Sequence, residues 1–254
     1  MREASADSVK ADDGTKEPKC WICGQAATTG EHKAKRSDLK SVFGRPSQKK
    51  PLFLHTRDNS KRLGSLNGGA LKWEKSLCES CNTAVTSPHD LAWEELSHYL
   101  RFRVPPILPG MTVRANRVFP YDSRREMLNV HFYFLKMLGC AIVDGKLPIP
   151  IADFSNAILK QKAHPHFYLQ FGFAPLPGGK AMVGASNPEG LQRVHDGAIG
   201  LLVWIYNVNQ LRVAMIFAPD ADEHWARKRG LWHPRDGSKR LLIGDFDLPD
   251  EDTT

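Results

Sequence analysis

The sequence predicts an α+β protein, because stretches with helical spacing alternate with stretches that read as strands. Apolar residues recur at helical spacing over residues 123–144, whereas residues 167–173 alternate apolar and polar side chains as a half-buried strand does. Residues 201–206 and 211–217 flank a polar turn at 207–210, which predicts a β-hairpin. Two Cys-x-x-Cys pairs in the N-terminal third add a candidate metal site to this framework.

The N-terminal part consists of short elements separated by turn residues. Ser37 offers a cap for a helical turn, and Ser87 followed by Pro88 is a typical start of a longer helix. Turn residues at 58–59 and 67–69 separate strand-like pieces. The predicted elements are strands at residues 28–33, 52–56, 62–66 and 70–73, and helices at residues 37–43 and 88–102.

A stiff, proline-rich stretch at residues 103–110 separates this part from a second unit. Further elements of the second unit are a predicted helix at residues 152–162 and a last strand at residues 240–243. Both ends of the chain are polar, and the leader has almost no apolar content. We therefore predict a disordered leader at residues 1–18, a zinc-knuckle unit at residues 19–103, an α+β accessory domain at residues 111–245 and an acidic tail at residues 246–254.

Composition places the chain among intracellular globular proteins. Its 254 residues are 41% hydrophobic, which is enough for a sizeable core. The longest apolar run, residues 127–143, is interrupted by His131 and Lys136 and is too short to span a membrane. The N-terminus lacks the apolar core of a signal peptide. These features predict a cytoplasmic protein with no membrane partner.

The net charge of +7 is concentrated between the two cysteine pairs. Residues 31–77 hold 12 Lys and Arg against 4 Asp and Glu, a balance of +8 (12 − 4), so the rest of the chain carries about −1. A basic segment of this kind is typical of a polyanion-binding surface, although a solvated lysine-rich loop has the same composition. The candidate nucleic-acid contacts are Lys33, Lys35, Arg36, Lys49, Lys50, Arg57, Lys61 and Arg62.

Cys20, Cys23, Cys78 and Cys81 form the two pairs, while Cys140 stands alone in an apolar stretch. In a reducing compartment, paired knuckles indicate metal ligands more than disulfides. Four thiolates close a tetrahedral site and leave no open position for substrate, so the predicted Zn²⁺ is structural. A redox role for one pair and a plain zinc ribbon that only binds are the competing interpretations.

Glu31, His32 and Asn82 lie beside these knuckles in the sequence. A carboxylate and an amide oxygen are suitable ligands for a hard divalent cation such as Mg²⁺ or Mn²⁺. A histidine titrates near neutrality and can accept a proton from water. Because adjacent residues of a strand face opposite ways, Glu31 and His32 need a bend or bulge to serve one site.

The order Cys-x-x-Cys, Glu31-His32, Cys-x-x-Cys-Asn82 resembles the ββα-metal endonucleases, also called the HNH or His-Me finger family. The likeness covers about residues 20–100 and is greatest to endonuclease VII-type resolvases and to HNH proteins of phages and mobile elements. It implies a zinc-stapled ββα-metal module with His32 as general base and Glu31 and Asn82 as ligands of the catalytic cation. Glu31 stands where Asp is commoner, and a basic insertion lengthens the path from His32 to Cys78.

The resemblance and the charge together predict a metal-dependent endonuclease that hydrolyses phosphodiester bonds in DNA. A role in phage defence or on a mobile element is implied by the resemblance alone. Two alternatives stay open: a zinc-stabilised nucleic-acid-binding protein without cleavage, and an HNH-type ribonuclease, since phosphate contacts do not distinguish DNA from RNA. The sequence leaves the oligomeric state open, a homodimer included.

Overall fold

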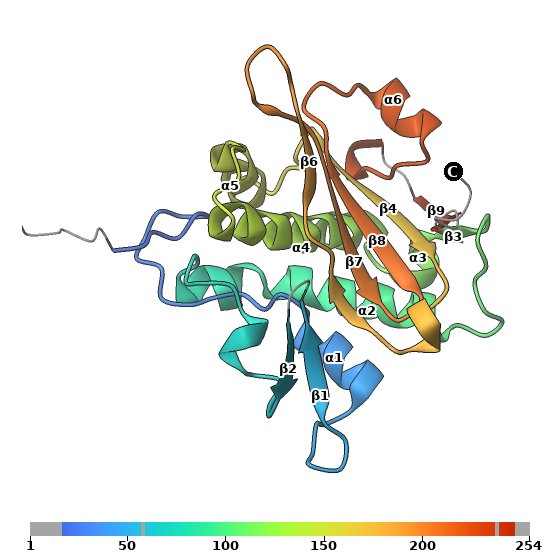
Figure 1. The fold of residues 1–254 in the computed structure, drawn as a ribbon. Helices are drawn as coiled ribbons and strands as arrows, with labels where there is room; N and C mark the ends of the chain where they lie inside the picture. The colour runs from blue at the N-terminus through green and yellow to red at the C-terminus, as the bar shows by residue number, and fades with distance from the viewer. Residues whose placement is uncertain (1–16, 57–58, 237–238, 247–254) are drawn as a thin grey trace, which may run out of the picture.

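The computed structural model describes residues 17–56, 59–236 and 239–246 and confirms the α+β class (Figure 1). Its helices are α1 (Arg36–Phe43), α2 (Ser87–Phe102), α3 (Ala115–Val118), α4 (Ser123–Asp144), α5 (Ile151–Leu159) and α6 (Glu223–Lys228). Its strands are β1 (Leu52–His55), β2 (Ser60–Leu63), β3 (Thr112–Arg114), β4 (Phe167–Phe173), β5 (Val183–Ala185), β6 (Glu189–Gln192), β7 (Ile199–Val208), β8 (Leu211–Phe217) and β9 (Arg240–Asp245). The predicted acidic tail and most of the predicted leader lie outside the described residues.

The larger sheet has the strand order β3-β9-β4-β8-β7-β5, and β6 also pairs with β7. Neighbouring strands are antiparallel, except that β4 and β9 run parallel. The predicted hairpin is β7–β8, and its turn is possible because Asn209 adopts a positive φ of 53°.

Alternation along the strands gives this sheet two apolar faces. On β8, Val213 and Met215 join the main core, whereas Ala214 and Ile216 face a smaller cluster that includes Ala226 of α6. Figure 1 shows α2 and α4 lying side by side on one side of the sheet and α6 on the other. The main core therefore lies between the sheet and the α2–α4 pair.

Helix α4 is central because almost every face of it is apolar. The Asp122 side chain caps its start by accepting a hydrogen bond from the Arg125 backbone N–H at 3.0 Å. Among the described residues, α4 is the one helix long and apolar enough to cross a membrane, but 83% of its most apolar window is buried inside the fold. The core helix of a soluble protein has the same character, so α4 is weak evidence for a membrane span.

The N-terminal part packs onto the same core. Buried residues from Cys20 to Ile243 form one continuous cluster, and α2 lies along α4. The two predicted strands at 28–33 and 70–73 run antiparallel but share one isolated bridge, His32–Lys72. Thr29 bridges to Leu77 beyond the second of them, and residues Gly69–Leu71 form a 3₁₀ turn. The β1–β2 hairpin projects from the opposite end of the molecule to α6 (Figure 1). The domain boundaries stay a prediction.

Candidate functional site

The four paired cysteines form a cluster that could hold a metal ion such as zinc. Their sulfur atoms all lie within 4.8 Å of one another, and Cys23 Sγ is 3.6 Å from Cys78 Sγ. The first pair sits on a tight turn in which the Gly24 N–H donates to the Cys20 carbonyl at 2.8 Å. The second pair opens onto a π-helical turn, Cys81–Val85. Four thiolates fit a closed tetrahedral site, as the sequence predicts.

The segment that carries Glu31 and His32 is anchored to the second cysteine pair through the backbone. The N–H groups of Thr28 and Thr29 both donate to the Leu77 carbonyl at 2.9 Å, one residue before Cys78. Gly30 then passes so close to the Trp73 carbonyl oxygen that a Cβ atom would overlap it. This close approach requires glycine and fixes where Glu31 begins.

Glu31, His32 and Asn82 line one cavity of about 440 Å³. The two adjacent residues Glu31 and His32 both line the cavity, and the chain bends at Lys33 directly after them. The Glu31 side chain folds back, and its Oε1 accepts a hydrogen bond from the His32 backbone N–H at 2.8 Å. The full lining is Glu31, His32, Lys35, Arg36, Ser37, Lys40, Asn82, Asp90 and Glu94. The structure thus brings together the three residues singled out in the sequence and adds two more carboxylates.

Three buried polar atoms of residues that line this cavity have no hydrogen-bond partner among the described residues. They are His32 Nε2, Ser37 Oγ and Asn82 Oδ1. A buried polar atom without a partner costs free energy, so such atoms at one cavity indicate a place for water, an ion or a substrate group. An amide oxygen of Asn82 and a carboxylate of Glu31 in one cavity are ligand types that a hard divalent cation prefers.

Burial lowers the pKa of His32 below its ordinary value of 6.5, and the neighbouring Glu31 only partly opposes this. His32 is therefore neutral near pH 7 and keeps a free nitrogen lone pair. Its neutral ring can accept a proton, which is the property that a general base needs.

Sequence reasoning missed Lys136 as a member of the site. This lysine is fully buried in α4, and its Nζ lies 2.8 Å from Glu31 Oε2 and 3.1 Å from Asp90 Oδ1. Burial alone would lower the pKa of Lys136, but Glu31 and Asp90 outweigh burial and raise it, so the lysine is charged. The available signal was a lysine inside an apolar helix, since buried lysines are almost always paired.

A second buried network attaches α1 to the rest of the fold. Asp38 Oδ2 accepts hydrogen bonds from Trp93 Nε1 and from Tyr206 Oη, both at 2.9 Å. Tyr206 Oη in turn accepts from the Lys35 backbone N–H at 2.9 Å. Burial raises the pKa of Asp38 above its ordinary value. Helix α1 carries Lys40 at the cavity, so strand β7 of the large sheet helps to position the basic side of the site.

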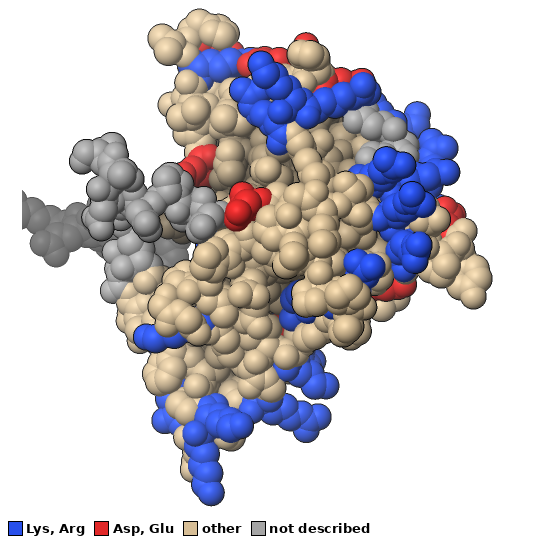
Figure 2. All heavy atoms as spheres, turned by 90° about the vertical axis from the view of Figure 1, so that its right-hand side faces the viewer, with Lys and Arg blue, Asp and Glu red and all other residues tan. Residues whose placement is uncertain are grey.

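The predicted nucleic-acid contacts divide into two groups. Lys35 and Arg36 line the cavity, and Lys35 Nζ lies 3.2 Å from Glu94 Oε1. The others that the structure describes are exposed: Lys33, Lys49, Lys50, Lys61 and Arg62. Figure 2 shows Lys and Arg side chains at the lower end of one face, at the height of the β1–β2 hairpin in Figure 1, and a further group at its upper end and along its right edge. Arg57 lies outside the described residues.

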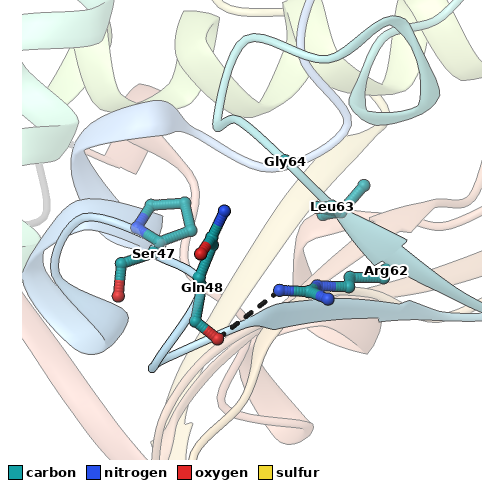
Figure 3. A pocket seen from close by; sticks show the side chains of 6 residues that line it. Ser47, Gln48, Arg62, Leu63 and Gly64 are labelled. Carbon is teal, nitrogen blue, oxygen red and sulfur yellow. Dashed lines mark hydrogen bonds between the residues drawn. The ribbon is translucent and has the colours of Figure 1, made fainter.

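The loop before β1 is attached to the hairpin. Arg62 on β2 donates from Nη2 to the Gln48 carbonyl at 3.5 Å, across a hollow of about 750 Å³ lined also by Ser47, Leu63 and Gly64 (Figure 3). The residues that line this hollow include one cationic side chain, Arg62, and no acid or histidine. The hollow is therefore part of the basic surface and has no candidate catalytic groups.

Comparison with known proteins assigns no relative. No family model matches the chain, and no curated protein or solved structure matches it. Function must therefore be inferred from the cavity and the cysteine cluster themselves.

Proposed function

We propose that this protein is a divalent-metal-dependent endonuclease of the HNH type that hydrolyses phosphodiester bonds in DNA. The observation that carries the proposal is one cavity lined by Glu31, His32 and Asn82, next to the cysteine cluster. Within the described part of the chain, His32 Nε2 and Asn82 Oδ1 of this cavity are buried without hydrogen-bond partners. A carboxylate, a neutral imidazole and an amide are the groups that metal-assisted phosphodiester hydrolysis uses.

Each residue has a separate role in this reaction. Glu31 and Asn82 would hold Mg²⁺ or Mn²⁺, which neutralises charge on the phosphate and stabilises the leaving oxygen. His32 accepts the proton of a water molecule as the water oxygen bonds to phosphorus and the bond from phosphorus to the leaving oxygen breaks. Solvent returns a proton to the leaving oxygen. Lys35 and Arg36, on the rim of the same cavity, attract the phosphate backbone.

The zinc that the four cysteines could hold has a structural role in this proposal. It ties the turn at Cys20 to the start of the turn that carries Asn82, and the backbone bonds of Leu77 extend this tie to Glu31. The exposed lysines and arginine of the β1–β2 region would grip nucleic acid outside the cavity.

One observation favours a second function, in which the protein binds nucleic acid but does not cut it. Both oxygens of Glu31 already accept hydrogen bonds, from the His32 N–H and from Lys136. A carboxylate satisfied in this way has fewer lone pairs left for a metal ion. The binding-only protein would keep the knuckles and the basic surface and be indifferent to Mg²⁺.

Cleavage of supercoiled plasmid separates the two functions. The assay compares the parent with His32→Ala in Mg²⁺, Mn²⁺ and EDTA, with zinc content measured for both proteins. We expect metal-dependent nicking by the parent and its loss in the variant, at equal zinc content. Nicking that persists in His32→Ala would contradict the assigned base. Absence of cleavage of both DNA and RNA by the parent would favour the binding-only protein.

A further inference from the structure

Lys136 occupies an unusual position, because it places a fully buried ammonium group against the wall of the cavity. Its Nζ contacts Glu31 Oε2 at 2.8 Å, the two Asp90 oxygens at 3.1 and 3.2 Å, and Thr86 Oγ1 at 3.3 Å. An ammonium group has three N–H donors, and these partners use them all. Burying a charge this completely is costly unless its partners compensate for it.

The ammonium group lies behind the cavity, because its partners line the wall and it does not. Glu31 and Asp90 are lining residues, whereas the Lys136 side chain is 0% exposed and lies on their inner side. A lysine that bound substrate phosphate would have to reach the cavity. Lys136 instead contacts Glu31 Oε2 and both oxygens of Asp90, and these two carboxylates belong to residues that line the cavity.

The same group joins three separate parts of the site. Glu31 comes from the N-terminal bridged segment, Asp90 from the first turn of α2, and Thr86 from the junction between the π-helical turn and α2. The Thr86 hydroxyl donates to the Cys81 carbonyl at 2.9 Å, one residue before Asn82. One atom of α4 thereby contacts Glu31 directly and is linked through Thr86 to the residue before Asn82.

We propose that Lys136 is a positioning residue and built-in counter-ion of the metal site, holding the carboxylates of Glu31 and Asp90 toward the cavity. This inference rests on the proposed function, because it takes the cavity to be the place of a divalent cation. A fixed positive charge beside that place repels a divalent cation, yet it keeps the two carboxylates from separating. The lysine therefore weakens metal binding and fixes the positions of the metal ligands.

This trade-off predicts opposite changes in binding and turnover when the charge is removed. In Lys136→Met, Mn²⁺ should bind roughly tenfold more tightly or better, because the repelling charge is gone. Nicking at saturating Mn²⁺ should fall roughly tenfold or more, because Glu31 is no longer held in place. If Lys136 mattered only for folding, replacing it would not strengthen metal binding.

Titration of the zinc-loaded protein with Mn²⁺, followed by electron paramagnetic resonance of the free ion, measures the affinity without any cleavage. Met137→Ala is the matched control, since Met137 is the buried neighbour of Lys136 on α4 and carries no charge. The control should leave Mn²⁺ affinity and turnover per folded molecule unchanged. Equal or weaker Mn²⁺ binding by Lys136→Met, or unchanged turnover, would overturn the proposal.

If Lys136→Met does not fold, a double variant with balanced charge can be compared with a single variant instead. Asp90→Asn with Lys136→Met removes one negative and one positive charge together, and Asp90→Asn alone is its reference. The double variant should bind Mn²⁺ more tightly and turn over more slowly than the reference. Identical behaviour of the two proteins would refute the role of the ammonium group.

The outcomes also separate this inference from the proposed function. A parent that binds Mn²⁺ but cuts neither DNA nor RNA would refute the nuclease, while tighter Mn²⁺ binding by Lys136→Met would still support the counter-ion. Failure of both the parent and Lys136→Met to bind Mn²⁺ would refute the inference, whatever the parent cuts.

Discussion

Tyr206 on β7 donates a hydrogen bond from Oη to Asp38 Oδ2 at 2.9 Å, and so links the large sheet to α1 beside the cavity. The same Oη accepts from the Lys35 backbone N–H at 2.9 Å. Replacing the tyrosine with phenylalanine removes both bonds and leaves buried partners unsatisfied.

We therefore expect Tyr206→Phe to lower the free energy of unfolding by about 2 kcal/mol. Urea unfolding of the zinc-loaded protein measures this. Tyr121→Phe is the control, because Tyr121 is fully exposed and should change stability little. Equal effects of the two variants would mean that the Asp38 network does not contribute to stability.

Cys81→Ser should abolish stoichiometric zinc binding, because a closed tetrahedral site loses one of its four thiolates. Since metal binding and folding are coupled, the variant should also unfold at a lower urea concentration. Metal analysis after gel filtration tests the first point. Cys140→Ala removes a buried thiol outside the cluster and should keep its zinc; zinc loss there would argue against the cluster as the site.

Gly30→Ala should damage the site without touching any of its side chains. The new Cβ atom would overlap the Trp73 carbonyl oxygen, so the segment that leads into Glu31 must move. We expect a loss of about 1 to 3 kcal/mol in stability and weaker Mn²⁺ binding. Gly64→Ala is the matched control, since nothing lies within 4 Å of its Cβ position; comparable losses there would show that the close approach is unimportant.

Acid should destabilise the fold through His164. Burial lowers the pKa of this histidine from 6.5 to about 3. The unfolded chain takes up a proton at His164 below about pH 6.5, while the folded chain does not. The contribution of His164 to the free energy of unfolding is therefore fully present above that pH and falls as the pH drops toward 3. The loss from His164 between pH 7 and pH 5 is about 2 kcal/mol.

His164→Gln cannot take up this proton, so its stability should fall less than the parent's over the same interval. Urea unfolding at pH 7 and pH 5, on both zinc-loaded proteins, gives the difference. An identical pH dependence would show that His164 does not account for the acid sensitivity.

Binding of duplex DNA should depend steeply on salt through the exposed lysines near the β1–β2 hairpin. Neutralising Lys49, Lys50 and Lys61 with glutamine should flatten the slope of log affinity against log salt by about 2 to 3, which corresponds to roughly 0.9 per phosphate contact. Fluorescence anisotropy across a salt series measures the slope. The same number of substitutions at Lys146, Lys160 and Lys162, on other exposed surfaces, should leave the slope nearly unchanged.

Local patterns in the sequence predict the longer elements of the second half of the fold but none of its short ones, β3, α3, β5, β6 and α6. The predicted helix at residues 123–144 and the predicted strands at 167–173 and 211–217 have the same bounds as α4, β4 and β8. These elements are rich in apolar residues because α4, β4 and β8 are buried along most of their length. Residues 70–73 were wrongly predicted as a strand: the Asn67-Gly68-Gly69 turn continues into a 3₁₀ turn, and pairing shrinks to single bridges.

The site was predictable only where its residues are close to a motif. Glu31, His32 and Asn82 reach one cavity as expected, because they adjoin the cysteine pairs. Lys136 and Tyr206 come from elements far along the chain, and no local pattern records which distant group a buried side chain will meet. Lys136 appeared in the sequence only as an interruption of an apolar run.

The two partners of the Glu31–Lys136 ion pair are synthesised at different times. A ribosome makes the cysteine pairs, His32 and Asn82 well before it reaches Lys136. A nascent or truncated chain would therefore carry the recognisable motif without the charge that sets its geometry. For the nuclease proposed above, this order would delay a competent site until more than half of the polypeptide has been made.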